Sequence, residues 1–342
     1  MTSLVTAFLV GFVAAGLATP VVRFLAVRAR LLDIPNERSS HSVPTPRTGG
    51  LAIIFGAGVG LAAATTRLDS QLGFLLAIAA AMAVVSEIDD VRGLSRSVRL
   101  IAQASAAVIL IRAAGLSFSP VDLPIATRGL GILAGVVTLV WIVGVTNAYN
   151  FMDGINGIAA AQAVIAATTL AVLAHRHGDL AAAAVLLAIA GACAGFLPWN
   201  FPGGSIFMGD VGSVTVGFAL AGLIVRLSLT SVSSVAAALT LAPFLLDTTA
   251  TLTRRIWRGE PFLSAHRSHF YQRQVALGYS HAAVTATWSL LAVVSALAAV
   301  GYDGAGAAAR VVLLAAVFLA HIIVAGLIVR SENVAGPRHS TD

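Results

Sequence analysis

Long apolar runs separated by short polar segments make up almost the whole chain. A membrane-spanning helix needs about 20 mostly apolar residues. The runs are rich in Leu, Ala, Val and Ile, which suits helices better than the alternating strands of a barrel. We therefore expect an all-α protein, a polytopic membrane helix bundle of about 11 transmembrane helices. The expected spans are 4–22, 49–66, 71–87, 98–115, 129–147, 155–174, 180–198, 212–229, 232–253, 281–300 and 308–329.

The composition supports a membrane protein and excludes several mechanisms. Of the 342 residues, 58% are hydrophobic and 11% are charged, whereas about 25% of residues are charged in soluble domains. All 21 basic residues are arginine, so neither a Schiff-base lysine nor a P-loop lysine is available. Cys193 is the single cysteine, which excludes an intramolecular disulfide. No soluble segment interrupts the series, so residues 1–342 are expected to form one integral membrane domain.

The arginines are distributed unevenly between the two sets of loops. If the N-terminus lies outside, fifteen arginines fall on the cytoplasmic side and six on the outer side. By the positive-inside rule, this bias predicts an N-terminus outside and a C-terminus in the cytoplasm. The same rule explains the net charge of +6, so the basic residues do not require a nucleic-acid partner.

The unusual polar sequence gathers in the five inter-helix loops that this orientation places in the cytoplasm. The outer loops carry ordinary turn sequence. Polar chemistry confined to one membrane face predicts a site that is reached from that face. The five segments are DIPNERSSHSVPTPRTGG (33–50), EIDDVRG (87–93), NAYNFMDGING (147–157), PWNFPGGSIFMGDVGS (198–213) and RRIWRGEPFLSAHRSHFYQR (254–273).

Three aspartates are candidates for catalysis or metal binding. Asp89 and Asp90 close the third expected span, where acidic residues are costly and usually functional. Neighbouring carboxylates repel each other, which suits a general base, a metal ligand or both. Asp210 lies between two glycines just before a span, where a phosphate or a metal can approach the backbone. A solvated helix end and a capped helix start are the alternatives.

Four polar side chains recur at every third position of the third loop, namely Asn147, Asn150, Asp153 and Asn156. This spacing places them near one helical face. Amide and carboxylate groups on one face could bind a sugar, a nucleobase or hydrated Mg²⁺. An ordinary polar turn is the alternative.

Basic residues in the first and last loops are candidates for binding phosphate groups. His266, Arg267 and His269 lie in the last loop without a cysteine or further histidine that would complete a zinc site, so recognition of a diphosphate is the better interpretation. Arg38 and Arg47 in the first loop suit bidentate phosphate binding. The alternatives are a basic loop at the membrane surface and arginines that serve only topology.

In their order and spacing, these segments resemble the polyprenyl-phosphate N-acetylhexosamine-1-phosphate transferases of glycosyltransferase family 4. That superfamily includes the MraY, WecA and WbpL types, and the motifs look closest to the WbpL-type O-antigen initiators. The resemblance covers about residues 33–273. It implies a multi-pass protein of the cell inner (cytoplasmic) membrane with its active site on the cytoplasmic face.

The resemblance also implies an activity. An N-acetylhexosamine-1-phosphate would pass from a UDP-sugar to undecaprenyl phosphate, releasing UMP and initiating O-antigen or another cell-envelope polysaccharide. The reaction would depend on Mg²⁺, or on Mn²⁺ in its place. Direct attack and a two-step route through an aspartyl phosphate both stay open, as does a homodimer.

Residue roles follow from the same resemblance. Asp89 matches the proposed base and Asp90 its paired aspartate, which we also take as a metal ligand. Asp210 matches the aspartate that binds Mg²⁺. Asn150 and Asp153 match residues of the nucleotide site, and the histidine motif is expected at the diphosphate. One departure is Asn156, because many members carry a second aspartate there.

Two alternative functions remain at this stage. A membrane transporter of an anionic metabolite would place polar residues near the bilayer midplane, whereas here they lie in loops. A peptidoglycan phospho-N-acetylmuramoyl-pentapeptide transferase is disfavoured because the chain lacks the three-histidine run of that branch. Phe270 and Tyr271, interleaved with basic residues, instead predict aromatic contacts with a small sugar.

Overall fold

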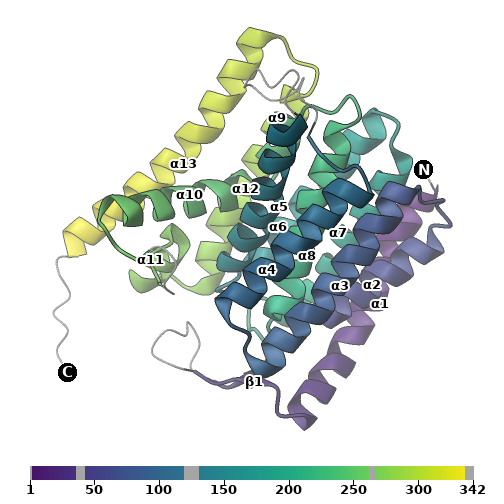
Figure 1. The fold of residues 1–342 in the computed structure, drawn as a ribbon. Coiled ribbons are helices and arrows are strands. Elements are labelled where there is room, and N and C mark those ends of the chain that lie inside the picture. Colours follow the sequence, from purple (N-terminus) through teal and green to yellow (C-terminus); the bar gives the residue numbers. More distant parts are fainter. Residues whose placement is uncertain (1, 36–42, 119–130, 262–265, 336–342) are drawn as a thin grey trace.

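The computed structural model describes residues 2–35, 43–118, 131–261 and 266–335, and nearly all of its regular structure is helical (Figure 1). Two short strands, β1 (Leu32–Asp33) and β2 (Thr45–Pro46), pair antiparallel in the first loop. The helices are α1 (Thr2–Arg28), α2 (Gly50–Ala63), α3 (Ser70–Arg92), α4 (Arg96–Ala113), α5 (Gly131–Phe151), α6 (Ile158–Arg176), α7 (Leu180–Asn200), α8 (Gly209–Ser228), α9 (Ser234–Leu239), α10 (Ala242–Trp257), α11 (Phe270–Ala276), α12 (His281–Tyr302) and α13 (Ala307–Ala335).

The helix bundle expected from the sequence is confirmed. Within the described part of the chain, eight helices are long and apolar enough to cross a membrane, namely α1, α3, α5, α6, α7, α8, α12 and α13. The expected spans 49–66 and 98–115 correspond to shorter or more polar helices, α2 with 14 residues and α4 with 18 residues. The protein is therefore a multi-pass membrane protein.

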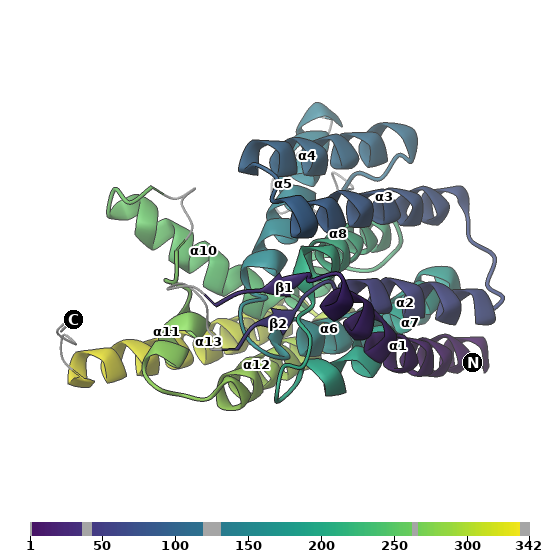
Figure 2. The same ribbon diagram turned by 90° about the horizontal axis from the view of Figure 1, so that it is seen from below.

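The prediction of one continuous span over 232–253 is wrong. The structure has two helices there, α9 and α10, separated at Thr240 and Leu241. Pro243 lies in the first turn of α10, where its missing N–H costs nothing, whereas inside a helix it would remove a hydrogen bond and clash with the preceding turn. The break lets α10 leave the side of the bundle (Figure 2).

One side of the bundle is built from α1, α2 and α7, which pack against one another (Figure 2). Two glycines of α7 make the contact with α1 possible. A Cβ atom at Gly191 would lie 2.1 Å from the carbonyl oxygen of Phe8, and one at Gly195 would lie 2.1 Å from that of Phe12. Close backbone approach through small residues is the usual way in which membrane helices associate.

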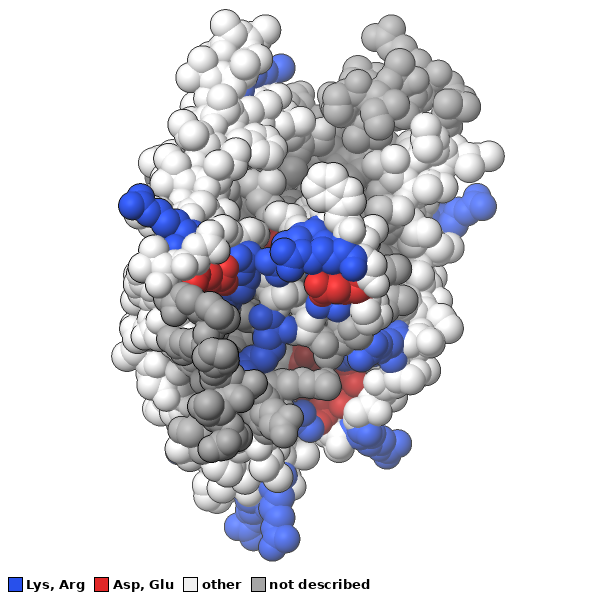
Figure 3. Space-filling view, turned by 90° about the vertical axis from the view of Figure 1, so that its left-hand side faces the viewer, with Lys and Arg blue, Asp and Glu red and all other residues white. Residues whose placement is uncertain are grey.

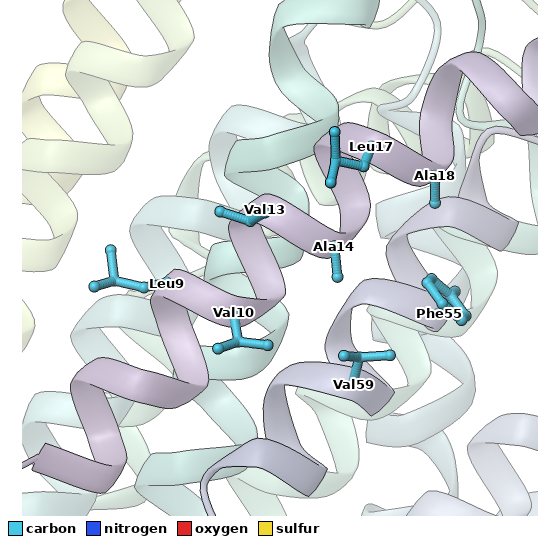
Figure 4. A pocket seen from close by; sticks show the side chains of 8 residues that line it. All are labelled: Leu9, Val10, Val13, Ala14, Leu17, Ala18, Phe55 and Val59. Atoms are coloured by element: carbon cyan, nitrogen blue, oxygen red, sulfur yellow. The ribbon is translucent and has the colours of Figure 1, made fainter.

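The outer surface of that side is apolar, as a surface in contact with hydrocarbon should be. A groove between α1 and α2 contains apolar side chains alone (Figure 4). The groove residues are Leu9, Val10, Val13, Ala14, Leu17, Ala18, Phe55 and Val59. On the other side of the molecule, α13 packs mainly on α12 and leaves most of its apolar residues exposed.

The most buried helix is α8, and it determines where the polar loops meet. Nearly all of its residues are buried, and it packs against α3 and α5. The first turn of α8 lies beside the last turns of both neighbours, because Val211 contacts Asp90 of α3 and Asp210 contacts Asn150 of α5. Segments far apart in sequence are thereby assembled at one end of the bundle.

Candidate active site

Main-chain and side-chain hydrogen bonds join the polar loops at that end. The first loop docks on the loop between α7 and α8, where Phe207 N donates to Pro46 O (2.8 Å) and Gly49 N donates to Phe207 O (2.9 Å). The last loop reaches the third, because Tyr271 Oη donates to Phe151 O (2.9 Å). Figure 3 shows a face of the molecule on which arginine side chains gather around acidic ones.

The paired aspartates lie in the last turn of α3 and are both buried. Asp89 accepts a hydrogen bond from Leu94 N (2.6 Å) and one from Arg99 Nη1 (3.1 Å). Asp90 Oδ2 accepts from Val211 N (2.9 Å) in the first turn of α8. Each carboxylate therefore has a fixed direction, and the two face different partners.

Gly209 makes the approach of α3 to α8 possible. Its φ is +72°, in the left-handed region that favours glycine. A Cβ atom at this position would lie 2.8 Å from Asp90 Oδ2, which is closer than real Cβ atoms come. Only glycine therefore fits at the position before Asp210.

Asp210 is partly exposed, with 29% of its side chain accessible, so a ligand can reach this carboxylate. Arg99 Nη1 lies 3.4 Å from its Oδ2 and also bonds Asp89, so one guanidinium bridges the two carboxylates. Asn150 Nδ2 donates to Asp210 Oδ1 (2.8 Å) and to Ser213 Oγ (2.9 Å). These contacts orient Asp210 from α4 and α5 at once. We refer to Asp89, Asp90, Asp153 and Asp210 below as the carboxylate cluster.

Asp153 belongs to this cluster through electrostatics. Burial raises the pKa of Asp153 well above its ordinary value, and the nearby negative charges of Asp210 and Asp90 raise that pKa further. The carboxylates of the cluster thus oppose one another's ionisation in a partly buried place, and a bound divalent cation would favour their charged forms.

The four polar positions of the third loop separate in space. Asn150 lies in the last turn of α5, and Asp153 follows the end of that helix. Asn147 points toward α4 and donates to Gln103 Oε1 (2.5 Å). Asn156 donates to Pro202 O (3.0 Å), so it holds the loop between α7 and α8. The helix ends at Phe151, which is why the regular spacing does not keep all four side chains on one face.

The histidine motif lies in a second group of contacts around α10 and α11. His269 is 2% exposed, and its Nδ1 lies 3.2 Å from Asp247 Oδ1. His266 is partly exposed, and its ring centroid lies 5.0 Å from that of His269. Burial, followed by the positive charges of His269 and Arg255, lowers the pKa of His266 to about 4. His266 is therefore neutral at pH 7, while Arg267 next to it is exposed.

Two further candidates concern phosphate and sugar contacts. Arg47 lies close enough to Asp90 and Glu87 to interact with both electrostatically, whereas Arg38 lies outside the described residues. Tyr271 is fully buried, so the predicted aromatic contact of this side chain with a sugar is wrong. The ring can be buried because its hydroxyl donates a hydrogen bond to Phe151 O.

The oxygen-rich donor set fits Mg²⁺ better than a softer metal. Within the described ranges, no three His, Cys, Asp or Glu side chains are close enough to form a complete metal site. Mg²⁺ does not require one, because it is usually held by one or two carboxylates, several waters and substrate phosphates. Asp210, with Asp90 and Asn150 beside it, matches that requirement.

Three residues of these sites were not identified as functional from the sequence. Arg99 enters the sequence argument only as one of the arginines that predict the membrane orientation, although it follows the paired aspartates by a single tight turn at Gly93. Ser213 lies near the start of α8, where a serine is ordinary and gives no signal of function. Asp247 lies within the expected span 232–253, and an acidic residue in such a position is itself a signal of function.

Comparison with known proteins agrees with this geometry. A model of glycosyl transferase family 4 matches residues 72–228, which contain the whole carboxylate cluster. A Bacillus subtilis (strain 168) protein named probable undecaprenyl-phosphate N-acetylglucosaminyl 1-phosphate transferase is 33% identical over 286 residues, covering 82% of this chain and 80% of that protein. The chain belongs to glycosyl transferase family 4. It is a glycosyl-1-phosphate transferase, and the transporter alternative is set aside.

Other relatives show the range of acceptors and sugars in this family. A decaprenyl-phosphate N-acetylglucosaminephosphotransferase of Mycolicibacterium smegmatis is 33% identical over 303 residues, covering 77% of this chain and 73% of that protein. A phospho-N-acetylmuramoyl-pentapeptide-transferase of Lactiplantibacillus plantarum is 36% identical over 142 residues, covering 40% of this chain and 43% of that protein. The similarity to the first kind of enzyme thus extends over much more of the chain.

Proposed function

We propose that this family 4 transferase moves an N-acetylhexosamine-1-phosphate from a UDP-sugar to undecaprenyl phosphate and releases UMP. The observation that carries the proposal is the carboxylate cluster, oriented by Arg99 and Asn150, at one end of a membrane bundle. A lipid phosphate held at the membrane surface and a soluble nucleotide-sugar can both reach such a place. The product would start O-antigen or another cell-envelope polysaccharide.

The proposed reaction is a single displacement at the β-phosphorus of the donor. An oxygen of the lipid phosphate forms a bond to this phosphorus, and the bond from the phosphorus to the oxygen that bridges it to the α-phosphate breaks. UMP leaves with that bridging oxygen. Asp89 takes the proton of the acceptor phosphate, so that the attacking oxygen is ionised.

The other residues of the site bind and orient the substrates in this proposal. Asp210 and Asp90 would hold Mg²⁺ or Mn²⁺, which when bound offsets negative charge on the diphosphate. Asn150 keeps Asp210 in place, Asp153 contacts the nucleotide, and Asn147 supports the site indirectly through its bond to Gln103 of α4. Arg38, Arg47, His266 and Arg267 supply positive or donor groups for phosphate oxygens.

We propose N-acetylglucosamine as the transferred sugar on the basis of the relatives, and a competition assay between UDP-sugars tests this proposal. Two of the three relatives above are named for N-acetylglucosamine, and the longest alignments are theirs. With purified protein, Mg²⁺ and undecaprenyl phosphate, UDP-N-acetylglucosamine is expected to outcompete UDP-N-acetylmuramoyl-pentapeptide by about tenfold or more. Several simple UDP-N-acetylhexosamines should be accepted, because one hydroxyl gives modest selectivity. Preference for the pentapeptide donor would show that the enzyme belongs to the peptidoglycan branch.

We place the site at the cytoplasmic face of the inner membrane. The support is the arginine bias, since the arginine-rich loops lie at the same end of the bundle as the carboxylate cluster. A cysteine introduced at Arg267 in a Cys193→Ser background tests this orientation. We expect labelling by a membrane-impermeant thiol reagent only from the cytoplasmic side, and labelling from the outside alone would contradict it.

A further inference from the structure

Asp247 is a buried carboxylate that the proposed reaction does not use. It lies in α10, and its side chain is 0% exposed. Its oxygens accept from Phe270 N (3.0 Å), Tyr271 N (3.2 Å) and Thr251 Oγ1 (3.0 Å), and His269 Nδ1 lies 3.2 Å away. A carboxylate buried this deeply is stable only with such a set of partners. Three of these four partners come from the consecutive residues 269–271, so the Asp247 carboxylate fixes the position of this segment on α10.

The anchored residues carry the histidine motif. His269 is held by its ring, Phe270 and Tyr271 are held by their main chain, and Arg254 Nη2 donates to Ser268 O (3.1 Å) from the same face of α10. The ring of His269 contacts that of His266, and His266 Nδ1 bonds Ser268 Oγ (2.9 Å). His269 is therefore an internal link, while His266 and Arg267 are the members of the motif that a ligand can reach.

The same anchor extends to the carboxylate cluster. Tyr271 packs closely against Gly154. A Cβ atom added at Gly154 would lie 2.1 Å from Tyr271 Oη. Gly154 follows Asp153, which belongs to the cluster. Residues 268–271 thus connect Asp247 on one side with Phe151 and Gly154, on either side of Asp153, on the other. We therefore expect a shift at Asp247 to move the histidine motif relative to the carboxylate cluster.

We infer that Asp247 is a positioning residue that acts through His269 and sets where His266 and Arg267 bind the diphosphate of the donor. The inference rests on the proposed function, because it assigns the diphosphate to the motif. In this arrangement His269 donates from Nδ1 to the carboxylate, which fixes the tautomer and the ring plane. The side chains of the motif at the surface are then preorganised for phosphate oxygens and lose little freedom on binding.

The test is the Asp247→Asn variant, which keeps the size of the side chain and removes its charge. We expect the KM for the UDP-sugar to rise by about tenfold or more, as for the loss of a hydrogen bond to a charged group. The KM for undecaprenyl phosphate is expected to stay within about threefold, because the acceptor is not bound by this motif. A role limited to stability would lower the melting temperature and the amount of active protein, and would leave both KM values unchanged.

Asp303 offers a matched control. It is another buried aspartate paired with a histidine, with His177 Nε2 at 2.7 Å, and it follows α12 at the end away from the site. Asp303→Asn should leave the KM of the donor unchanged. A rise in donor KM equal to that of Asp247→Asn would mean that any buried histidine–aspartate pair has this effect, and would overturn the inference.

A double substitution tests whether Asp247 acts through His269. Asp247→Asn should add little to the donor KM in a His269→Ala background, since the ring it positions is gone. Additive effects would overturn the inference. If Asp247→Asn does not fold, Thr251→Val removes one donor from the carboxylate and keeps its charge; we expect a smaller rise in donor KM, of about threefold, and an unchanged KM would contradict the inference.

Two outcomes separate this inference from the proposed function. Wild-type protein that neither turns over UDP-sugars nor binds UDP in calorimetric titration with Mg²⁺ would refute the function, and the inference with it. Wild-type protein that turns over normally beside an Asp247→Asn variant with unchanged donor KM would refute the inference alone.

Discussion

Asp210→Asn is expected to abolish transfer while leaving the protein folded and inserted in the membrane. Substitution of groups that merely support metal ligands costs about 10- to 100-fold in affinity or activity, so loss of a direct ligand should exceed that range. The amide also places a donor next to Arg99 Nη1, which now lies 3.4 Å from Asp210 Oδ2. The turnover number and the Mg²⁺ dependence of the purified variant measure the effect.

Asp69→Asn is the control for this substitution. Asp69 lies at the other end of α3, caps that helix by accepting from Leu72 N (2.9 Å) and pairs with Arg226. Asparagine also caps helices well, so activity should remain close to that of the wild type. Near-normal turnover of Asp210→Asn, or full wild-type activity in EDTA, would remove Asp210 from the proposed metal site.

Asp89→Asn and Asp90→Asn are both expected to be strongly impaired, with different pH profiles. Loss of a general base typically costs about 100-fold or more, and we expect this deficit for Asp89→Asn at pH 5.5. The deficit should shrink as the pH rises through the second ionisation of the acceptor phosphate, near pH 6 for a phosphate monoester. At higher pH the attacking oxygen is already ionised, so the base is no longer needed.

Asp90→Asn should show no such recovery. Its Oδ2 accepts from Val211 N (2.9 Å) and lies against Gly209, so it supports the turn that carries Asp210. The expected effect is a higher requirement for Mg²⁺ or donor at every pH. Rates of both variants measured from pH 5.5 to 8.5 decide the matter, and parallel profiles would contradict this division of roles.

The fold could be predicted from hydropathy because membrane helices need length and apolar residues above all. That rule fails where local stereochemistry dominates. It predicts one span over 232–253, whereas Pro243 begins a new helix and α10 carries a polar face. Asp247, Thr251 and Arg255 are buried on this helix, and hydropathy alone averages them with their apolar neighbours.

The sequence predicts which loops form the site, but it predicts only some of the contacts between their side chains. The sequence places Asp89, Asp90 and Asp210 at helix ends, and packing of α8 between α3 and α5 brings them together. Arg99 and Asp247 act through partners that are distant in sequence, 111 residues from Arg99 to Asp210 and 22 from Asp247 to His269. Spacing within one loop cannot reveal such pairs, and it predicts a shared role for Asn156, whose side chain bonds Pro202 O instead.

The fate of the β-phosphorus tests the central claim most directly. Purified protein would be incubated with undecaprenyl phosphate, Mg²⁺ and UDP-N-acetylglucosamine labelled with ³²P in the β-phosphate, and the lipid and aqueous phases separated. Transfer of sugar-1-phosphate predicts that the label moves to the lipid phase together with the sugar, leaving unlabelled UMP in water, and that Asp210→Asn gives none of this transfer. Label that stays in the aqueous phase as UDP while the sugar reaches the lipid would contradict the account.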